Sequence, residues 1–257
     1  MTTQSRAWAA GALALAVAAC ATARGPAPLR ADDYTAILAN SGRTAEDMKD
    51  DAARKPAQVL QFARIRPGDN IFEMEVGRGW YTDILSTAVG PAGHITTQNA
   101  PEFSFEFGAM AERRKAGRLK NVTETITHFD QLQAPDGSAD VVLWILGPHE
   151  VYYVPKGSKG LGDPHRAFAE IVRVLKPGGE LIAMDHAAEA GTPPLVSGAL
   201  HRIDPGVVLK LAAEAGLKYD ARDDVLANPT DDRSKIVFDS TVRRHTDQFL
   251  FRFYKAS

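Results

Sequence analysis

The sequence of 257 residues contains a single cysteine, Cys20, so no disulfide can form within the chain. It also lacks a strong charge, because its formal net charge is −2, and it has neither runs of like charge nor internal repeats. These absences give no reason to expect nucleic acid or an anionic membrane surface as the main partner. With 44% hydrophobic residues, the chain can still build the core of one large α/β domain.

The N-terminus differs from the rest of the chain. Arg6 precedes an apolar run from Ala7 to Ala19, whose 13 residues are few for a membrane-spanning helix but typical of a signal peptide. The run ends at Cys20 and resembles the bacterial lipobox, in which the cysteine is acylated and becomes the new N-terminus. We therefore expect a signal peptide over residues 1–19, lipidation of Cys20, a tether over residues 20–31 and a folded domain over residues 32–257. The protein would be a periplasmic lipoprotein of the cell envelope, attached to a membrane through its lipid only. An ordinary signal peptide with a chance cysteine, or a wrong start codon, is the alternative.

Hydrophobic patterning predicts strands that alternate with helices, after a helical N-terminal region. The expected strands are Asn70–Met74, His94–Gln98, Val122–Thr127, Ala139–Leu146, Glu180–Asp185, Tyr219–Leu226 and Asp247–Tyr254. The expected helices are Asp33–Asn40, Thr44–Ala63 with a new start at Pro56, a helix that ends near Val89, Glu102–Gly117, His165–Leu175 and Pro205–Ala215. The fourth strand is almost wholly apolar, as at the centre of a parallel sheet. The pattern indicates an α/β fold with a doubly wound, mostly parallel sheet.

A glycine turn connects the first strand to the following helix. Glycine lets a ligand approach the main chain closely, and the start of a helix leaves backbone N–H groups unpaired. Both properties suit a cofactor that carries a carboxylate or phosphate. Glu73, at the end of the strand, can receive hydrogen bonds from an amino group of such a ligand. A tight turn without a ligand is the alternative explanation of the glycines.

Three motifs in this order resemble those of class I S-adenosylmethionine-dependent methyltransferases: Glu73–Gly79, Pro135–Asp140 and Val174–Gly179. The resemblance covers roughly Lys55 to Tyr254. More narrowly, four further stretches resemble a poorly characterised bacterial group of exported predicted methyltransferases: Gly79–Thr82, Asp185–Ala187, His201–Asp204 and Thr246–Phe249. The resemblance implies a Rossmann-like, seven-stranded sheet with one antiparallel strand near the edge. It also implies S-adenosylmethionine as the cofactor and methyl transfer to a small molecule.

The resemblance assigns cofactor contacts residue by residue. Glu73 would contact the amino group of the cofactor, and Gly77 and Gly79 would approach its methionine moiety. Glu75 replaces the usual first glycine. Asn99 stands where an acidic residue usually binds both ribose hydroxyls; its amide can accept one such hydrogen bond, but it lacks the charge that strengthens the pair.

The adenine contacts are expected after the third strand. His128 stands where an aspartate usually meets the adenine amino group. The Phe129 ring could lie against the adenine, and Asp130 could substitute for the missing aspartate.

Histidines follow several strands at the carboxyl edge of the predicted sheet, where open parallel sheets bind ligands. Imidazole can move a proton near neutral pH, as transfer of a methyl group to oxygen or nitrogen requires. We expect His149 to be the general base, with His186 and His201 as the next candidates. Each has a structural alternative, which is a hydrogen bond within a loop for His149 and the role of a satisfied buried histidine for His186. Arg202 would bind a substrate carboxylate or pair with a neighbouring acid.

Two other functions use the same residues. In one, the histidines hold a metal; we predict no metal site, because HxH and HxxxH spacings are absent and the ligands would have to converge from separate loops. In the other, the protein is a catalytically degenerate binding protein that keeps the fold. The sequence shows no basic groove with interleaved aromatic residues, so a nucleic-acid acceptor is not expected. It indicates neither the acceptor nor the oligomeric state.

Overall fold

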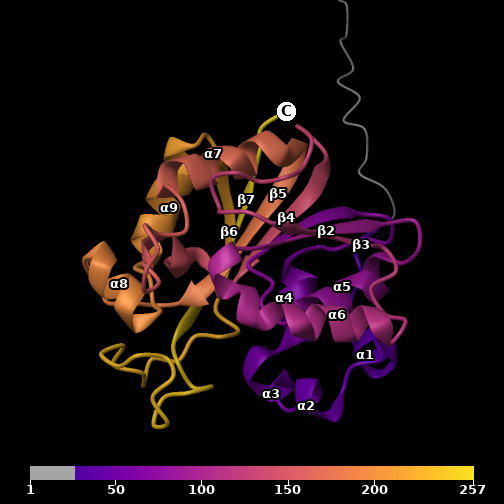
Figure 1. Ribbon diagram of the computed structural model, residues 1–257, viewed down its shortest axis with the longest axis horizontal. Helices are drawn as coiled ribbons and strands as arrows, with labels where there is room; N and C mark the ends of the chain where they lie inside the picture. Colours follow the sequence, from indigo (N-terminus) through magenta and orange to yellow (C-terminus); the bar gives the residue numbers. More distant parts are fainter. Residues whose placement is uncertain (1–26) are drawn as a thin grey trace, which may run out of the picture.

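The computed structural model of this protein describes residues 27–257 (Figure 1). The predicted signal peptide, Cys20 and the first part of the predicted tether lie outside the described residues. Within residues 27–257, every helix is too short or too polar to cross a membrane.

A seven-stranded sheet crosses the molecule in the order β3-β2-β1-β4-β5-β7-β6. Its strands are β1 (Asn70–Met74), β2 (His94–Asn99), β3 (Val122–Ile126), β4 (Ala139–Ile145), β5 (Leu175–His186), β6 (Lys218–Asp223) and β7 (Gln248–Tyr254). Strand β7 runs antiparallel to both β5 and β6, while the pairs among β1 to β5 are parallel. The predicted doubly wound sheet, with its antiparallel strand next to the edge, is confirmed.

Helices cover both faces of the sheet (Figure 1). One face packs against α1 (Ala31–Asn40), α4 (Pro56–Phe62) and α5 (Trp80–Val89), and the other packs against α7 (Pro164–Val174) and α9 (Pro205–Glu214). The remaining helices are α2 (Ala45–Met48), α3 (Asp51–Arg54), η1 (Pro101–Glu106), α6 (Phe107–Lys115), η2 (Pro148–Tyr152) and α8 (Pro194–Leu200).

Strand β4 contributes side chains to the hydrophobic cores on both faces of the sheet. Val141 and Leu143 lie in the core under α4 and α5, whereas Val142 and Trp144 lie in the core under α7 and α9. All four side chains are fully buried. Successive residues of a strand point to opposite faces, so an apolar run of this kind specifies a strand that is covered on both sides.

Two predicted helices differ from the structure. Residues 44–63 form the three short helices α2, α3 and α4. The break between α2 and α3 was not predicted, whereas the predicted new start at Pro56 is confirmed and follows Lys55 in a left-handed conformation (φ 43°). A residue before proline is disfavoured in the helical region, so the break at Lys55 is expected physically. Residues 101–106 form the 3₁₀ helix η1, with non-helical angles at Phe103, and the α-helix α6 starts only at Phe107. Helices η2 and α8 were not predicted.

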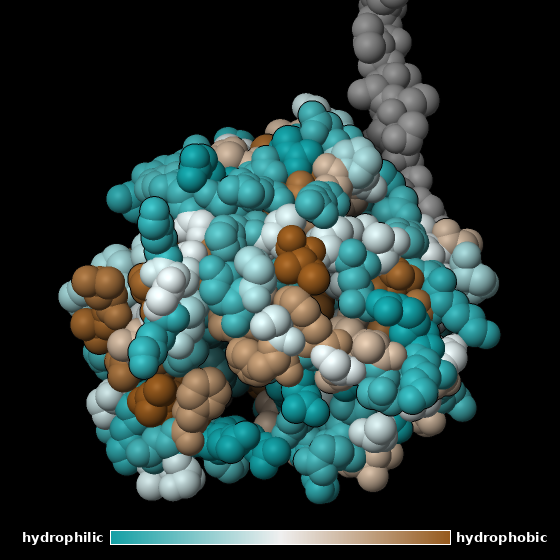
Figure 2. All heavy atoms as spheres, viewed as in Figure 1, coloured by the Kyte–Doolittle hydropathy of each residue, from teal (hydrophilic) through white to brown (hydrophobic). Residues whose placement is uncertain are grey.

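The order of the strands reverses between β1 and β4, which are neighbours in the sheet. Ligands of open α/β sheets bind outside the carboxyl ends of the strands at this kind of switch point. The segment of residues 224–247, which connects β6 to β7, extends beyond the sheet at the lower left of Figure 1. Figure 2 shows the molecular surface hollowed between this segment and the region of α2 and α3.

Candidate functional site

The turn between β1 and α5 contains three residues with positive φ: Glu75 (52°), Gly77 (52°) and Gly79 (77°). Side chains from the end of β2 hold this turn. Gln98 Oε1 accepts a hydrogen bond from the Glu75 N–H at 3.1 Å. Asn99 Oδ1 accepts one from the Gly77 N–H at 2.9 Å, and Asn99 Nδ2 donates to the Gly77 carbonyl at 3.2 Å. In this structure Asn99 therefore positions the glycine turn, and its amide group is engaged there instead of facing a ribose.

Side chains of η1 and α6 cover the two glycines. A Cβ atom at Gly77 would lie 2.5 Å from the Glu106 carboxylate, and one at Gly79 would clash with the Met110 sulfur. Gly79 is thus required for the packing of α6 on the turn, and it does not line the cavity described below. Gly77 does line that cavity, and the atom nearest to it is the mobile end of a side chain.

Glu73 lies at the end of β1 and is 5% exposed. Its Oε2 accepts a hydrogen bond from the Thr82 hydroxyl at 2.8 Å. Burial raises the pKa of Glu73 to about 8, against the effect of that hydrogen bond, and the nearby Asp83 charge adds to the rise. The carboxyl group therefore carries its proton at neutral pH.

A cavity of about 940 Å³ lies at the carboxyl end of β1. Its lining includes Glu73, Gly77 and Trp80 from the first strand, the turn and α5, together with residues of α2, α6 and the segment 224–247. This volume is within the range of roughly 300–1,000 Å³ that small-molecule sites occupy. The cavity is where the sequence predicts the cofactor.

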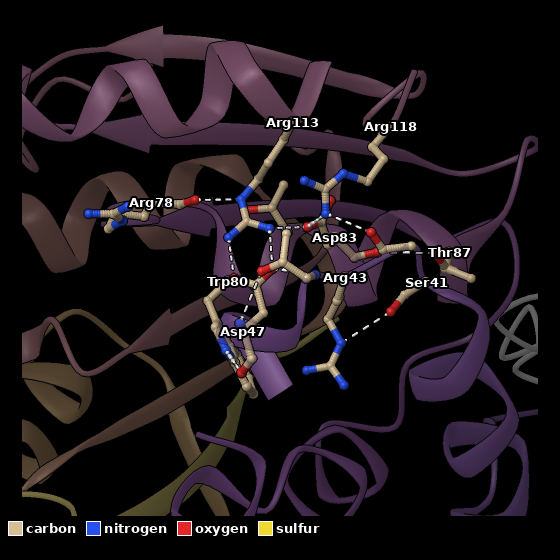
Figure 3. A network of polar contacts seen from close by, with 12 residues as sticks. Ser41, Arg43, Asp47, Arg78, Trp80, Asp83, Thr87, Arg113 and Arg118 are labelled. Carbon is tan, nitrogen blue, oxygen red and sulfur yellow. Dashed lines mark hydrogen bonds and ion pairs between the residues drawn. The ribbon is translucent and has the colours of Figure 1, made fainter. Parts of the chain in front are cut away.

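A buried ion-pair network forms one wall of this cavity (Figure 3). Arg113, which is 7% exposed, pairs with Asp83 and, at 2.7 Å, with Asp47. It also donates from Nε to the Arg78 carbonyl at 2.7 Å, and the Trp80 indole N–H donates to the Asp47 carbonyl at 2.8 Å. The network ties α2 and α6 to the glycine turn. This network could not be predicted from local sequence patterns, because Asp47 and Arg113 are 66 positions apart.

Carboxyl groups are concentrated in the same cavity. Glu75, Glu106 and Glu150 line it, and Glu75 Oε2 is buried with no hydrogen-bond partner among the described residues. Burial raises the pKa of Glu75 well above its usual value, and the charges of Glu150 and Glu106 contribute to this rise. The pKa of Glu106 is also raised, mainly by burial. The ionised form of Glu75 is therefore costly by itself, and a ligand that brings positive charge beside it would stabilise that form.

A second cavity, of about 240 Å³, adjoins the first. Seven residues line both: Asp50, Arg54, Leu146, Glu150, Phe238, Arg243 and Arg244. The three histidines that were predicted to act on a proton, His149, His186 and His201, all line the second cavity. The structure therefore brings these three together, although they come from η2, the end of β5 and the end of α8.

His149 is the centre of this cluster and is 3% exposed. Its Nδ1 lies 2.9 Å from both Asp185 carboxylate oxygens. Its Nε2 lies 3.0 Å from His201 Nδ1 and 3.1 Å from Glu150 Oε1. Burial alone would lower the pKa of His149, but the charge and hydrogen bond of Asp185, with Glu150, raise it to about 10. Burial would likewise raise the pKa of Glu150, but hydrogen bonds from His149 and His201 lower it to about 2.

His186 differs electrostatically from His149. Burial lowers the pKa of His186 well below its usual value, and the neighbouring positive charges of His149 and Arg202 lower it further. Its Nδ1 lies 2.7 Å from the Thr246 hydroxyl. His186 is therefore the neutral imidazole of the cluster. His201 is held between aromatic rings, with ring centroids 4.9 Å from both Tyr153 and Phe238.

Arg202 anchors the segment 224–247 and does not face a ligand. It is fully buried, and it pairs with Asp231 at 2.8 and 3.2 Å. It also donates to the carbonyls of Lys235 and Ala187. Of the two interpretations of Arg202, pairing with an acid is the one that the structure supports.

The predicted adenine contacts lie outside both cavities. His128 pairs with Glu102 at 3.1 Å, and the Asp130 carboxylate pairs with Arg166 at 2.7 Å. The Phe129 side chain is fully buried in the core, with its ring centroid 5.2 Å from that of Trp144. In this structure the Phe129 ring therefore packs within the core and offers no face to an adenine.

Residues 73–183 match the model of a methyltransferase domain family. A ubiquinone/menaquinone biosynthesis C-methyltransferase UbiE of Hydrogenovibrio crunogenus is 28% identical over 139 residues, which are 54% of this chain and 50% of that protein. A demethylmenaquinone methyltransferase of Listeria monocytogenes is 27% identical over 128 residues, or 50% of this chain and 49% of that protein. The chain thus matches about half the length of these relatives.

Solved structures show the same fold. A SAM-dependent methyltransferase from Aquifex aeolicus has a TM-score of 0.58 and 18% identity, and the match covers 86% of this chain and 97% of the other. The [4+2]-cyclase SpnF has a TM-score of 0.60 and 20% identity, with 80% and 81% covered. These comparisons confirm the predicted fold of class I methyltransferases and support S-adenosylmethionine as the cofactor. The predicted exported lipoprotein group stays a prediction.

Proposed function

Because residues 73–183 match a methyltransferase domain and the chain has the class I methyltransferase fold, we propose that it transfers a methyl group from S-adenosylmethionine to a small molecule. The observation that carries this proposal is the pair of adjoining cavities at the switch point between β1 and β4. One contains the glycine turn and the other contains the three histidines. Donor and acceptor would thus meet at the lining that the two cavities share.

The charges of the larger cavity fit the donor. S-adenosylmethionine carries a sulfonium and an ammonium group, and the cavity offers the unpartnered Glu75 oxygen beside Glu106 and Glu150. The raised pKa favours the protonated form of Glu75, and a cationic ligand beside it would stabilise the ionised form and pair with it. Glu106 has to move from above Gly77 for a ligand to reach the main chain, and its carboxylate can then pair with the ammonium group.

The proposed reaction depends mainly on alignment of the two reactants. When bound, S-adenosylmethionine supplies the methyl group. Three arginines, Arg54, Arg243 and Arg244, line the junction of the cavities, and they favour an acceptor with negative charge. Leu146 and Phe238, which line the same junction, would exclude water. Where the acceptor has to lose a proton, the neutral His186 imidazole would accept it, because His149 already carries one.

Calorimetry on the purified chain tests the proposal. We expect both S-adenosylmethionine and S-adenosylhomocysteine to bind with one molecule per chain and a dissociation constant below about 1 mM, the upper end of ordinary substrate affinities. Glu75→Gln should weaken S-adenosylmethionine more than S-adenosylhomocysteine, because only the former carries the sulfonium charge. If neither compound releases heat at millimolar concentration, the methyl-transfer function is overturned, and a binding protein without catalysis is the better description.

A further inference from the structure

The side chains of His149, Glu150 and His201 converge on one point at the wall of the smaller cavity. The three pairwise distances among His149 Nε2, His201 Nδ1 and Glu150 Oε1 are 3.0, 3.1 and 3.3 Å. A tetrahedral ion with bonds of about 2.0–2.1 Å separates its ligand atoms by about 3.3 Å. Each ligand atom can therefore reach a common ion after shifts of a few tenths of an ångström. Among the described residues, these three side chains are the group whose ligand atoms lie close enough together to hold one metal ion.

We propose that His149, Glu150 and His201 bind a divalent transition-metal ion. Two imidazoles and one carboxylate on one side of an ion, with positions left open on the other, are the ligand set of catalytic zinc and non-haem iron sites. The open side faces the smaller cavity, so the ion can bind an oxygen of a small molecule there. The metal site stands whether or not the chain transfers methyl groups.

Asp185 prepares His149 for this role. It is fully buried at the end of β5, and both its oxygens lie 2.9 Å from His149 Nδ1. It also accepts hydrogen bonds from the backbone N–H groups of His149 and His186, both at 2.7 Å. Because the carboxylate accepts the Nδ1 proton, a metal that displaces the second proton of the ring would bind the lone pair of Nε2. Metal-binding histidines commonly use this arrangement, which orients the ring and fixes the tautomer.

Glu150 gives an independent indication. It is 7% exposed, and its second carboxylate oxygen, Oε2, is buried without a hydrogen-bond partner among the described residues. Buried polar atoms are nearly always hydrogen-bonded, so an orphaned carboxylate oxygen beside two imidazoles suggests a missing ligand. An ion bound by both Glu150 oxygens, or a water molecule on an ion bound through Oε1, would satisfy it. His201 is pre-positioned as well, because it ends α8 in a left-handed conformation (φ 52°) with its ring between Tyr153 and Phe238.

Metal analysis of the full chain, purified without a histidine tag, tests the site. The chain is stripped with a chelator and titrated with Zn²⁺ in a calorimeter; Co²⁺ then replaces Zn²⁺ so that visible absorption bands report the ligand geometry. We expect one ion per chain and the bands of tetrahedral or five-coordinate Co²⁺. His201→Ala and the nearly isosteric Glu150→Gln should each reduce Zn²⁺ affinity by about a hundredfold, and Asp185→Asn by about 10–100-fold.

His94→Ala is the matched control, since His94 is exposed at the start of β2, and it should bind Zn²⁺ as the natural chain does. Circular dichroism shows whether each variant is folded. Binding of less than about a tenth of an ion per chain at saturating Zn²⁺ would overturn the proposal. So would affinity that is unchanged in folded His201→Ala and Glu150→Gln. Failure to bind S-adenosylmethionine would leave this result untouched.

Discussion

Asn99 binds both main-chain polar groups of Gly77, accepting from its N–H at 2.9 Å and donating to its carbonyl at 3.2 Å. The side chain that stands where an acid usually binds ribose thus acts as a brace for the glycine turn. A carboxylate could keep only the first of these bonds, because it has no proton to donate. This relationship reverses the expected effect of restoring the usual acid.

Asn99→Asp is predicted to weaken the turn without improving cofactor binding. The aspartate oxygen would face the Gly77 carbonyl, so the free energy of unfolding should fall by about 1–3 kcal/mol, the cost of a lost and unreplaced buried hydrogen bond. Urea unfolding measures the loss, and calorimetry should show no gain in affinity for S-adenosylmethionine. Asn40→Asp, which removes a similar bond at an exposed site, should cost much less. Tighter binding by Asn99→Asp would refute this role of Asn99.

Gly77→Ala is predicted to separate backbone strain from occupation of the cofactor site. The new Cβ would lie 2.5 Å from the Glu106 carboxylate. Gly137→Ala is the control, because Gly137 has a similar φ (59°) and open space around it. Both substitutions carry the left-handed penalty of about 1–2 kcal/mol. Affinity for S-adenosylmethionine should drop at least tenfold, or about 1.4 kcal/mol, in Gly77→Ala alone. Equal affinities in the two variants would place the ligand away from Gly77.

Glu73→Gln is predicted to change how stability depends on pH. The folded pKa of about 8 is above the unfolded value of 4.5, so the folded state retains a proton that the unfolded state has lost. Through this group the natural chain loses stability as pH rises from about 4.5 to 8, and the variant lacks that contribution. The difference is bounded at about 5 kcal/mol, and we expect about 2 kcal/mol in favour of the variant at pH 8.5. Unfolding at several pH values measures it, with Glu189→Gln, on the exposed surface, as the control.

Arg113→Ala is predicted to destabilise the fold severely. It removes the partner of two carboxylates, of which Asp83 is 2% exposed. Breaking a buried pair from one side costs about 3–5 kcal/mol, and Arg118, which also pairs with Asp83 at 2.8 Å, should reduce this loss to about 2–4 kcal/mol. Arg113→Lys should recover little, because lysine cannot donate to Asp47, Asp83 and the Arg78 carbonyl together. Thermal unfolding measures both variants. Lys115→Ala, in the same helix but 79% exposed, should change stability by less than about 0.5 kcal/mol.

The sheet was predictable because its signals are local. Buried strands such as Asn70–Met74 and Ala139–Ile145 are apolar runs bounded by turn residues, and the structure places them within one residue of the prediction. The gathering of His149, His186 and His201 at one edge followed from the topology, since carboxyl ends of parallel strands lie side by side. The new helix start at Pro56 was predicted, because proline is suited to the first turn of a helix. The break between α2 and α3 and the one at Phe103 were missed, because helical periodicity continues across both positions.

The details of the site were not predictable, because they depend on which side chain reaches which partner. Asn99 stands at the usual position of a ribose ligand, yet it binds the main chain of the turn after the preceding strand, 22 positions earlier. Phe129 lies three residues beyond the end of β3, where an aromatic residue is suited equally to a ligand or to the core. In the structure its ring packs against Trp144 in the core. The convergence of His201 on His149 spans 52 positions and has no sequence signature.

The buried pair of Arg202 and Asp231 has a consequence for the wall that the two cavities share. It fastens one end of the segment 224–247, and Arg233, paired with Asp247 at 2.8 Å, fastens the other. Between these fixed points, Phe238, Arg243 and Arg244 border both chambers. Because both ends of this span are tied by ion pairs, a change in the shape of the wall that it contributes would require bending within the span.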